Sequence, residues 1–452
     1  MANGAGEIKS GNGAVKIEND ASVNEEKEPI KFLFISFEAL SGDLAWRIQE
    51  EGHEVKFWTR NATEREIYDG FLEKIEKWED YKDWADIIVF DDAGFGKFAD
   101  ALRRAGKFVI GGSVYTDKLE EDREFGQEEM KRVGMIILPH WDFVDYDVAI
   151  EFIKANPGRY VFKPSGSIPS SQKGILFIGQ EESGSDLVEV LEHNKKTWSK
   201  KIKKFQLQKY ANGVEVAVGA FFNGHDFIYP VNINFEHKKL FPGDIGPSTP
   251  EMGTLMFWST TNKIFTLTLE KMKSALVECG YIGYIDINCI ANNNGIYPLE
   301  FTSRFGYPTI SIQMEGILTP TAEWLVKMAK GEDFELRTKK GFQVGVVVAV
   351  PPFPYDDEEE FEIYKDSSIV FKKPNLEGVH LGDVKLVDGD WRVAVDGYSL
   401  VVTGSGITVA EARRMAYNRI DNILLQNKFY RTDIGLKWNT DSDRLQSWGY
   451  LY

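Results

Sequence analysis

The pattern of apolar and polar residues predicts alternating strands and helices near the start of the chain. Residues 31–37 form a continuous apolar run, KFLFISF, which is typical of a strand buried on both faces. Residues 41–51 then place apolar side chains at helical spacing. Further short apolar runs, each predicting a strand, lie at 55–58, 85–90 and 108–110. Because strands alternating with helices form right-handed βαβ units, we expect a parallel sheet in an N-terminal α/β domain.

Beyond about residue 121 the pattern changes to longer strands joined by tight turns. Helices are expected over 123–134 and 271–277. Strands are expected at 160–164, 174–178, 205–210, 214–222, 227–231, 284–290 and 296–301. The Asn223-Gly224 pair between two apolar runs predicts a hairpin with a type I′ turn.

The last part of the chain predicts a β-rich domain. Strands are expected at 344–350, 368–372, 383–387, 391–395 and 399–403. A helix follows over 408–425, where Thr408 and Glu411 have the spacing of a capping box. The segment from about residue 427 looks irregular. The acidic run at 356–360 is most simply a solvated loop.

The composition agrees with several packed domains. The chain has 452 residues, of which 43% are hydrophobic and 13% aromatic, enough for two to four domains. Lysine and arginine number 53 against 70 acidic residues, so the formal net charge is −17. An acidic chain without a basic block is a poor partner for nucleic acid or an anionic membrane surface. It still allows a local basic pocket for a phosphate compound.

Other counts exclude further classes of protein. Cys279 and Cys289 are the only cysteines, which excludes a disulfide scaffold and fits a reducing, cytoplasmic location. No run of 18 apolar residues occurs, so no membrane span is expected. Residues 1–30 are polar, lack the apolar region of a signal peptide and are expected to be a disordered tail. We expect a monomer or a small homo-oligomer.

The first candidate for chemistry is the segment from Lys163 to Gly174, FKPSGSIPSSQKG with the preceding phenylalanine. Lys163 ends a predicted strand, a loop of small residues follows, and Lys173 precedes the next strand. Small residues let backbone N–H groups approach phosphates, and a lysine supplies a positive charge. The spacing is not that of a Walker A loop. An ordinary solvent-exposed hairpin remains the alternative.

The second candidate lies on two strands joined by a tight turn, which carry Asp286 and Glu300 among apolar residues. A carboxylate on a buried strand is costly unless it is paired or bound to a metal. Two such carboxylates would attract Mg²⁺, and Arg304 could hold an anionic substrate or transition-state oxygen. The alternative is a structural ion pair between Arg304 and either carboxylate.

The third candidate is the segment 235–253, FEHKKLFPGDIGPSTPEMG, which mixes charges, turn formers and apolar residues. Segments of this kind are usually surface connections, but long irregular ones often carry function. His237 on its own is most simply a solvated or locally bonded histidine.

The order of these segments resembles the ATP-grasp superfamily, and within it the phosphoribosylamine–glycine ligase family. In that family a strand lysine precedes a small-residue loop ending in Lys-Gly, as Lys163 and Lys173-Gly174 do here. The family's DHK…DGDxGPNTGGMG is matched by 237–238 and 243–253. Its EFNxRFGDPE is matched by 300–309, and its VTGxGxTxxEAxxxAY and YRxDIG by 402–417 and 430–435. The resemblance spans about residues 31–437.

The resemblance implies a multidomain α/β and α+β fold with five parts. These are a tail at 1–30, the α/β domain at 31–120, an ATP-grasp domain at 121–340 with a lid at about 135–210, a C-terminal β-rich domain at 341–437 and a tail at 438–452. It also implies a ligase that uses ATP and Mg²⁺ (or Mn²⁺) to join a small carboxylate to an amine. In that reaction the carboxylate takes the γ-phosphoryl group, and the amine then displaces phosphate.

The family motifs assign expected roles to particular residues. Arg123 and Lys163 are expected to face ATP phosphates, and the backbone of Gln208, Lys209 and Tyr210 the adenine. Glu300 and Asp286 are the expected metal ligands. Arg304 is the expected stabiliser of the transferring group, with Lys173 as a second catalytic candidate. Glu215 is a further nucleotide-site candidate, and the expected substrate residues are His237, Lys238, Gly246, Pro247 and Gly253.

Departures from the family motifs raise doubt about the amine. The family's first strand ends in GxGGREHA, a loop that binds the substrate phosphate, whereas this chain has SFEALSGD at 36–43. Glu38 and Asp43 would repel a phosphate. Thr302 replaces the metal-strand asparagine, Pro250-Glu251 replace a Gly-Gly pair, and Tyr307 and Thr309 replace two acidic residues.

Three functions therefore stay open. One is an ATP-grasp ligase with an altered acceptor, and another is a true phosphoribosylamine–glycine ligase of purine biosynthesis. The third is a non-catalytic ATP-binding scaffold. An NAD-dependent oxidoreductase is disfavoured, because no GxGxxG follows the first strand.

Overall fold

The computed structural model describes residues 28–451 except 166–174, 261 and 356–357. The N-terminal domain contains the predicted parallel sheet, in the order β2-β1-β3-β4. Its strands are β1 Lys31–Ser36, β2 Glu54–Thr59, β3 Ile87–Phe90 and β4 Phe108–Ile110. β1 lies centrally and is buried on both faces, as its unbroken apolar run predicts. Helices α1 Gly42–Glu50 and α2 Gly96–Arg104 follow β1 and β3.

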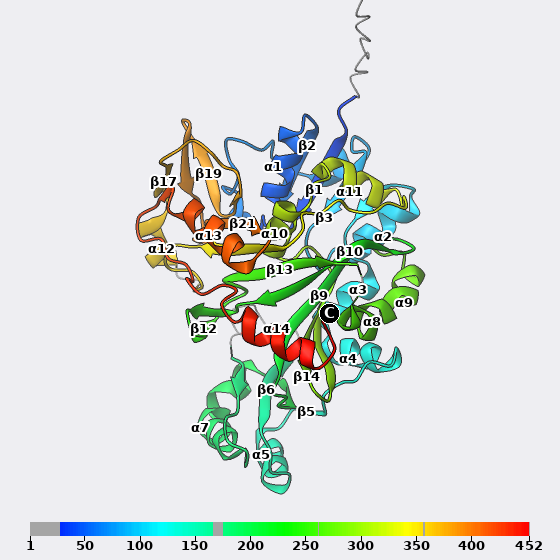
Figure 1. The fold of residues 1–452 in the computed structure, drawn as a ribbon, viewed down its shortest axis with the longest axis vertical. Helices are drawn as coiled ribbons and strands as arrows, with labels where there is room; N and C mark the ends of the chain where they lie inside the picture. Colours follow the sequence, from blue (N-terminus) through cyan, green and yellow to red (C-terminus); the bar gives the residue numbers. More distant parts are fainter. Residues whose placement is uncertain (1–27, 166–174, 261, 356–357, 452) are drawn as a thin grey trace, which may run out of the picture.

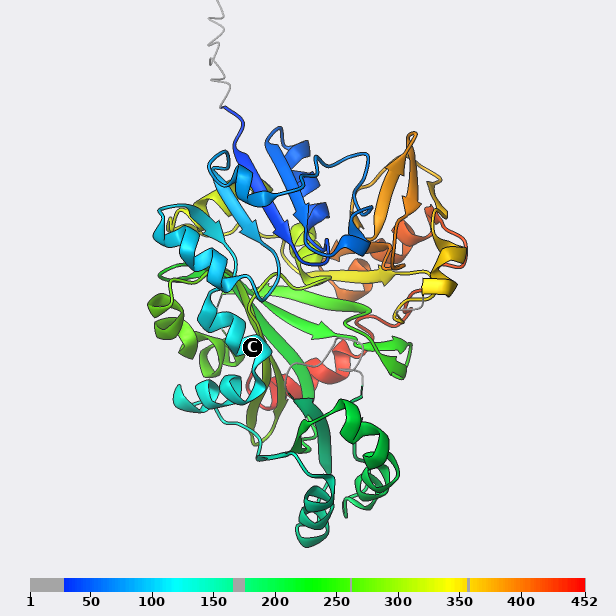
Figure 2. The ribbon, with the colours of Figure 1, turned by 180° about the vertical axis from the view of Figure 1, so that it is seen from behind.

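One eight-stranded antiparallel sheet forms the centre of the molecule, in the order β15-β14-β9-β10-β13-β16-β21-β18. Five strands come from the middle of the chain: β9 Val214–Asn223, β10 Phe227–Glu236, β13 Gly253–Ser259, β14 Ile282–Asn292 and β15 Gly295–Thr302. Three come from its last part: β16 Phe342–Val348, β18 Val379–Leu381 and β21 Leu400–Gly406. The sheet therefore continues past residue 341, with the parallel sheet packed above it (Figure 2).

A smaller antiparallel sheet projects from the lower end of the molecule in Figure 1. Its order is β5-β8-β6-β7, from β5 His140–Phe143, β6 Tyr160–Ser165, β7 Phe177–Ile178 and β8 Lys204–Lys209. Helices α5 Tyr146–Ala155 and α7 Ser185–Lys201 complete it. Its core is separate from that of the central sheet and is largely aromatic, with the Tyr146 and Phe205 rings 4.5 Å apart.

A third four-stranded sheet, β19-β20-β17-β22, lies in the C-terminal region together with helices α12 and α13. The elements are β17 Ser368–Phe371, β19 Val384–Val387, β20 Asp390–Val393, β22 Ile423–Leu424, α12 Glu358–Tyr364 and α13 Val409–Ile420. The predicted capping box is confirmed, since Thr408 and Glu411 exchange side-chain and backbone hydrogen bonds.

Several short helices link the sheets. Helices α3 Val114–Glu121 and α4 Arg123–Arg132 lead from the parallel sheet toward the lid. Helices α8 Lys263–Leu267, α9 Lys273–Glu278, α10 Thr309–Gly316 and α11 Thr321–Ala329 connect strands of the central sheet. Among the described residues, no helix has both the length and the apolarity that a bilayer span needs.

Three expectations were wrong in detail. The chain after residue 427 is not irregular, because it contains α14 Trp438–Ser447, whose Trp438 ring packs 5.0 Å from Phe342. The segment 235–253 is not wholly irregular, because β11 Lys239–Phe241 pairs with β12 Ile245–Ser248. The strand expected at 174–178 is only β7 Phe177–Ile178, and its first residue lies outside the described part of the chain.

Gly253 lies where β13 and β16 approach closely, and its φ of +146° is one that L side chains rarely adopt. A Cβ there would lie 2.5 Å from the Gly345 carbonyl oxygen. We therefore expect Gly253→Ala to lower the free energy of unfolding by about 1–3 kcal/mol, the usual cost of overpacking. Denaturant unfolding of the purified chain measures this loss. Gly295→Ala is the control, since its nearest contact is an ordinary 3.6 Å; equal losses in the two variants would contradict the explanation.

Candidate active site

Arg123 and Lys163 lie close enough for their positive charges to interact. Arg123 is the first residue of α4, and Lys163 lies on β6 with 8% of its surface exposed. Burial and the positive charges of Arg123 and Lys238, opposed by Glu300, together lower the pKa of Lys163 to about 8. Two cations that lie close enough to repel each other suit an anionic ligand such as a triphosphate. Lys173, the other lysine expected here, lies outside the described residues.

Glu300 faces these cations from β15. Its side chain is about half exposed, and the positive charges of Lys238, Arg123 and Lys163 hold its pKa at about 2. Its closest ionic contact is Lys238, whose Nζ lies 3.5 Å from the Glu300 carboxylate. Lys238 Nζ also lies 3.3 Å from Glu236 and 3.7 Å from Glu215. Lys238, expected at the substrate, therefore bridges three carboxylates, and sequence reasoning missed Glu236 among them.

Asp286 lies beside this group on the neighbouring strand β14. It is 3% exposed, and burial together with the charges of Glu236 and Glu120 raises its pKa to about 8. Strand register places Asp286 opposite Thr302 and Asn288 opposite Glu300. Because residues two apart on a strand share a face, all four lie on one face of the sheet. Asp286 and Glu300 are thus brought together as expected.

The oxygen atoms on this face suit a hard divalent cation. Asp286 Oδ1 and Asn288 Oδ1 are buried without a hydrogen-bond partner. Carboxylate and amide oxygens are the donors that Mg²⁺ takes, usually together with phosphate oxygens. As the side chains stand, no three His, Cys, Asp or Glu residues of the described ranges form a ready metal cage. Glu300, Asp286 and Asn288 have the chemistry to hold Mg²⁺ together with a nucleotide.

Arg304 makes neither of the ion pairs considered for it from the sequence. Its Nε lies 3.1 Å from Asp92 and 3.2 Å from Glu120, which belong to the N-terminal domain and α3. Glu120 also accepts the Ser303 backbone N–H at 2.7 Å. These carboxylates, opposed by burial, raise the pKa of Arg304, so it stays charged. Arg304 therefore sits where the central sheet meets the parallel sheet, an arrangement that local sequence could not reveal.

The expected adenine segment joins the lid to the central sheet. Gln208 is 2% exposed on β8, where it pairs with both β5 and β6. The N–H groups of Lys209 and Tyr210 donate to the carbonyls of Pro139 and Arg159. The Arg159 guanidinium lies 3.5 Å from the centre of the Tyr210 ring. The segment is thus fixed in place, and contact with adenine stays a prediction.

Of the other substrate candidates, His237 and Gly253 are packed inside the structure. His237 is 5% exposed, its Nε2 accepts the Gly435 N–H, and burial lowers its pKa to about 4. Gly246 and Pro247 lie on the short strand β12, and Gly253 lies at the β13–β16 approach. The geometry favours the simpler interpretation of His237, a locally bonded histidine.

Asp43 does not act as a free charge near a substrate phosphate, and that expectation was wrong. It turns inward from α1, and its carboxylate contacts His380 Nδ1 at 2.7 Å and the Leu381 N–H at 2.9 Å. Arg47 lies 3.6 Å away. Burial opposes the charged form, but these partners prevail and lower the pKa of Asp43. The residue ties the N-terminal domain to β18.

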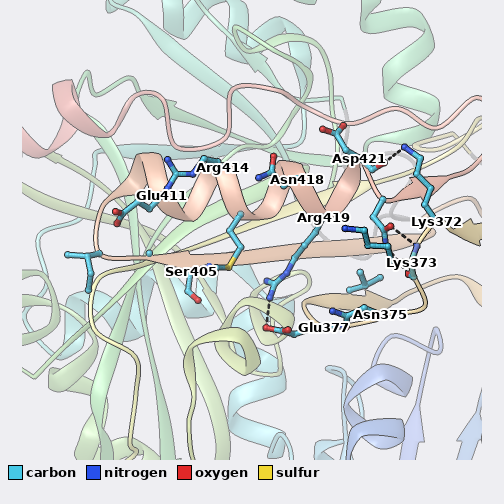
Figure 3. Close-up of a pocket in the computed structure, with 15 residues that line it drawn as sticks. Lys372, Lys373, Asn375, Glu377, Ser405, Glu411, Arg414, Asn418, Arg419 and Asp421 are labelled. Atoms are coloured by element: carbon cyan, nitrogen blue, oxygen red, sulfur yellow. Dashed lines mark hydrogen bonds and ion pairs between the residues drawn. The ribbon is translucent and has the colours of Figure 1, made fainter.

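An open hollow lies on the C-terminal region, and none of these candidate site residues lines it. It has a volume of about 800 Å³ and is lined by α13 and the residues around β17 and β18 (Figure 3). Arg419 reaches from α13 to Glu377 at 2.8 Å across it. The residues expected from the sequence to carry chemistry therefore lie away from this hollow, at the junction of three sheets.

Comparisons with known proteins relate two long segments of the chain to one synthetase family. The family model described as "Phosphoribosylglycinamide synthetase, ATP-grasp (A) domain" matches residues 121–310, and the model of the C domain of the same synthetase matches residues 343–437. Phosphoribosylamine–glycine ligase of Streptococcus pneumoniae is 26% identical over 362 residues, covering 77% of this chain and 82% of that protein. The Listeria monocytogenes ligase is 26% identical over 353 residues, covering 75% and 80%.

Solved structures show the same fold. Phosphoribosylamine–glycine ligase of Thermotoga maritima superposes with a TM-score of 0.69 at 23% identity, covering 90% of this chain and 100% of that one. Biotin carboxylase of Campylobacter jejuni superposes with a TM-score of 0.62 at 14% identity, covering 94% and 98%. The chain belongs to the ATP-grasp superfamily. Within it, the chain is a phosphoribosylamine–glycine ligase-like enzyme, a ligase of the kind that forms C–N bonds with ATP and Mg²⁺.

The lowered pKa of Lys163 gives a pH test of its contact with nucleotide. Bound phosphates favour the charged ammonium, whereas the free protein loses that charge above about pH 8. Affinity for a non-hydrolysable ATP analogue should therefore fall as pH rises from 8 to 10, by up to about tenfold per unit. Calorimetric titrations at pH 7, 8, 9 and 10 measure this. In Lys163→Arg the guanidinium stays charged, so its profile should be flatter; parallel profiles would contradict the assignment.

Proposed function

We propose that this protein activates a small carboxylate with ATP and transfers the acyl group to an amine other than phosphoribosylamine. The proximity of Arg123, Lys163 and Glu300, whose charges interact, supports the first half of this proposal, because such a group suits a magnesium-bound triphosphate. The altered acceptor is supported by the first-strand loop. That loop has SFEALSGD where relatives of this family type bind a phosphate through glycines.

The residues position and neutralise the reacting groups rather than forming covalent bonds themselves. Arg123 and Lys163 would bind the ATP phosphates. Glu300, Asp286 and Asn288 would hold Mg²⁺, which supplies charge neutralisation to the phosphoryl oxygens. Lys238 favours the ionised form of Glu300 in the absence of nucleotide by lowering its pKa. Arg304 would stabilise the negative charge of the acyl phosphate, held in place by Asp92 and Glu120.

A true phosphoribosylamine–glycine ligase is the second candidate, favoured by the names of the relatives. It would bind the sugar phosphate without the family's glycine loop. Rescue of a purine-requiring strain by the gene would support this candidate and contradict the altered acceptor. Failure of rescue with well-expressed protein would favour the first proposal.

The third candidate, a non-catalytic ATP-binding scaffold, differs from both ligases in its expected response to the loss of the Glu300 charge. Glu300→Gln removes a metal-binding charge while keeping the side-chain shape. In an enzyme, phosphate release from Mg-ATP with panels of carboxylates and amines should fall at least 100-fold, about 2.7 kcal/mol of transition-state stabilisation. Glu278→Gln, at the end of α9, is a matched control expected to leave the rate unchanged.

Two results would overturn the proposal. Phosphate release that is equal in the wild type and in Glu300→Gln would indicate a scaffold or a contaminating activity. Absence of ATP binding at millimolar nucleotide would contradict an ATP-grasp site altogether.

A further inference from the structure

Carboxylates gather around the loop that joins β1 to α1. Glu64 lies close enough to Glu38, Asp396 and Asp91 for each of them to raise its pKa, which burial and these neighbours bring to about 8. The residues come from three separate parts of the chain: the first strand's loop, residues 64–91 and the C-terminal region. Their juxtaposition is therefore a product of the tertiary fold. We call this group the acidic pocket.

Two oxygens in the acidic pocket lack a donor. Asp91 is 1% exposed, and its Oδ1 has no hydrogen-bond partner, whereas its Oδ2 accepts from the Ser41 N–H and hydroxyl. Glu64 Oε1 accepts from Asn61 Nδ2 at 2.7 Å, but its Oε2 is buried without a partner. A buried acceptor that lacks a donor costs free energy. Both atoms thus favour a ligand that brings N–H groups.

The nearby cations do not neutralise these two carboxylates. Within the described ranges, Asp91 and Glu64 take part in no ion pair of 4 Å or less with a lysine or arginine. Arg304 is held by Asp92 and Glu120, and Arg47 is held by Asp43. The Arg60 guanidinium lies 5.0 Å from the centre of the Phe37 ring. A positive ligand would supply the missing charge.

The acidic pocket adjoins the place expected for acyl transfer. Asp91 is followed in the chain by Asp92, which binds Arg304, and the Tyr307 hydroxyl donates to the Asp91 carbonyl at 3.4 Å. A cavity of about 30 Å³ lies beside it, with Glu38, Ser41, Tyr307 and Asp396 among its lining residues. That volume holds about two water molecules, or a group of similar size such as an ammonium.

Tyr68 and Tyr398 also line this cavity. Aromatic rings offer apolar surface for methylene groups and a favourable face for a cation. The rings and the carboxylates therefore suit the charged end of a ligand, and a short aliphatic chain would extend beyond a cavity of this volume.

We propose that the acidic pocket binds the protonated second amino group of a di- or polyamine acceptor; this rests on the ligase function proposed above. The free amino group attacks the carbonyl carbon of the acyl phosphate, forming the C–N bond of an amide. The C–O bond to phosphate breaks, and the leaving phosphate takes the proton that the amine loses. The anchored ammonium takes no part in the bond changes and sets the orientation of the chain.

The test compares 1,4-diaminobutane with n-butylamine, which has the same carbon chain but one amino group. Each is titrated calorimetrically into the full chain, with and without a non-hydrolysable ATP analogue and Mg²⁺. The diamine should bind at least tenfold more tightly than the monoamine. Equal affinities would overturn the proposal, as would tighter binding of ribose 5-phosphate than of the diamine.

Variants of two of its carboxylates test whether the diamine binds at the acidic pocket. Glu64→Gln and Asp91→Asn should each reduce diamine affinity at least fivefold and leave affinity for the ATP analogue within twofold. Glu50→Gln, an exposed glutamate on α1, is the matched control and should change neither. Because Asp91 is buried and could affect folding, Glu64→Gln, which is only partly buried, provides the second variant. A preference for the diamine that survives in both variants would contradict this site.

The two proposals fail in different ways. Loss of nucleotide binding contradicts the ligase, and the preference for the diamine is then still measured from titrations without nucleotide. Normal nucleotide binding without that preference contradicts only the acidic pocket as an amine site.

Discussion

The structure depends on the balance of charge where its sheets meet. Lys238 places one ammonium among the carboxylates of Glu215, Glu236 and Glu300, so strands that carry like charges can lie side by side. The Glu236 side chain is almost fully buried, and burial of an unpaired carboxylate would cost several kcal/mol. Arg304 lies between Asp92 and Glu120 in the same way, at the place where the central sheet meets the parallel sheet. Arg304 therefore joins segments far apart in the chain and links the N-terminal domain to the central sheet.

In two places buried side-chain oxygens have no hydrogen-bond partner, and each place suggests a ligand. Beside Lys238, Asp286 and Asn288 keep free oxygens that suit Mg²⁺ with nucleotide. Beyond Arg304, Asp91 and Glu64 keep free oxygens that suit an ammonium. The first place agrees with the ATP-grasp relatives, whereas the second differs from the glycine-rich phosphate loop of the resembled family. Under the proposed function, the nucleotide half of the site follows the family, and the acceptor half is where this chain departs from the family's motif.

The local pattern of apolar residues and turn residues predicted the strands well. It did not predict side-chain contacts between distant parts of the chain. The parallel sheet and the Asp286–Glu300 hairpin followed from apolar runs and turn residues, which act locally. Helix α14 was missed because its sequence is mostly polar and its position depends on Trp438 packing against Phe342. The partners of Arg304 and Asp43 were also missed, since both residues pair across domain junctions. Such pairings depend on tertiary contacts, which no single stretch of sequence encodes.

Because the central sheet is continuous, a cut of the chain near residue 341 would expose the edge of one of its strands. A cut near residue 341 separates the segments matched by the two family models, yet it removes β16, which pairs along β13. The truncated sheet would then end at β13, with unpaired backbone groups beside the buried side chains of Leu255 and Met256. Exposed, apolar strand edges pair with other chains and aggregate. The sequence modules are therefore not separable folding units, and the C-terminal region protects the ATP-grasp sheet from self-association.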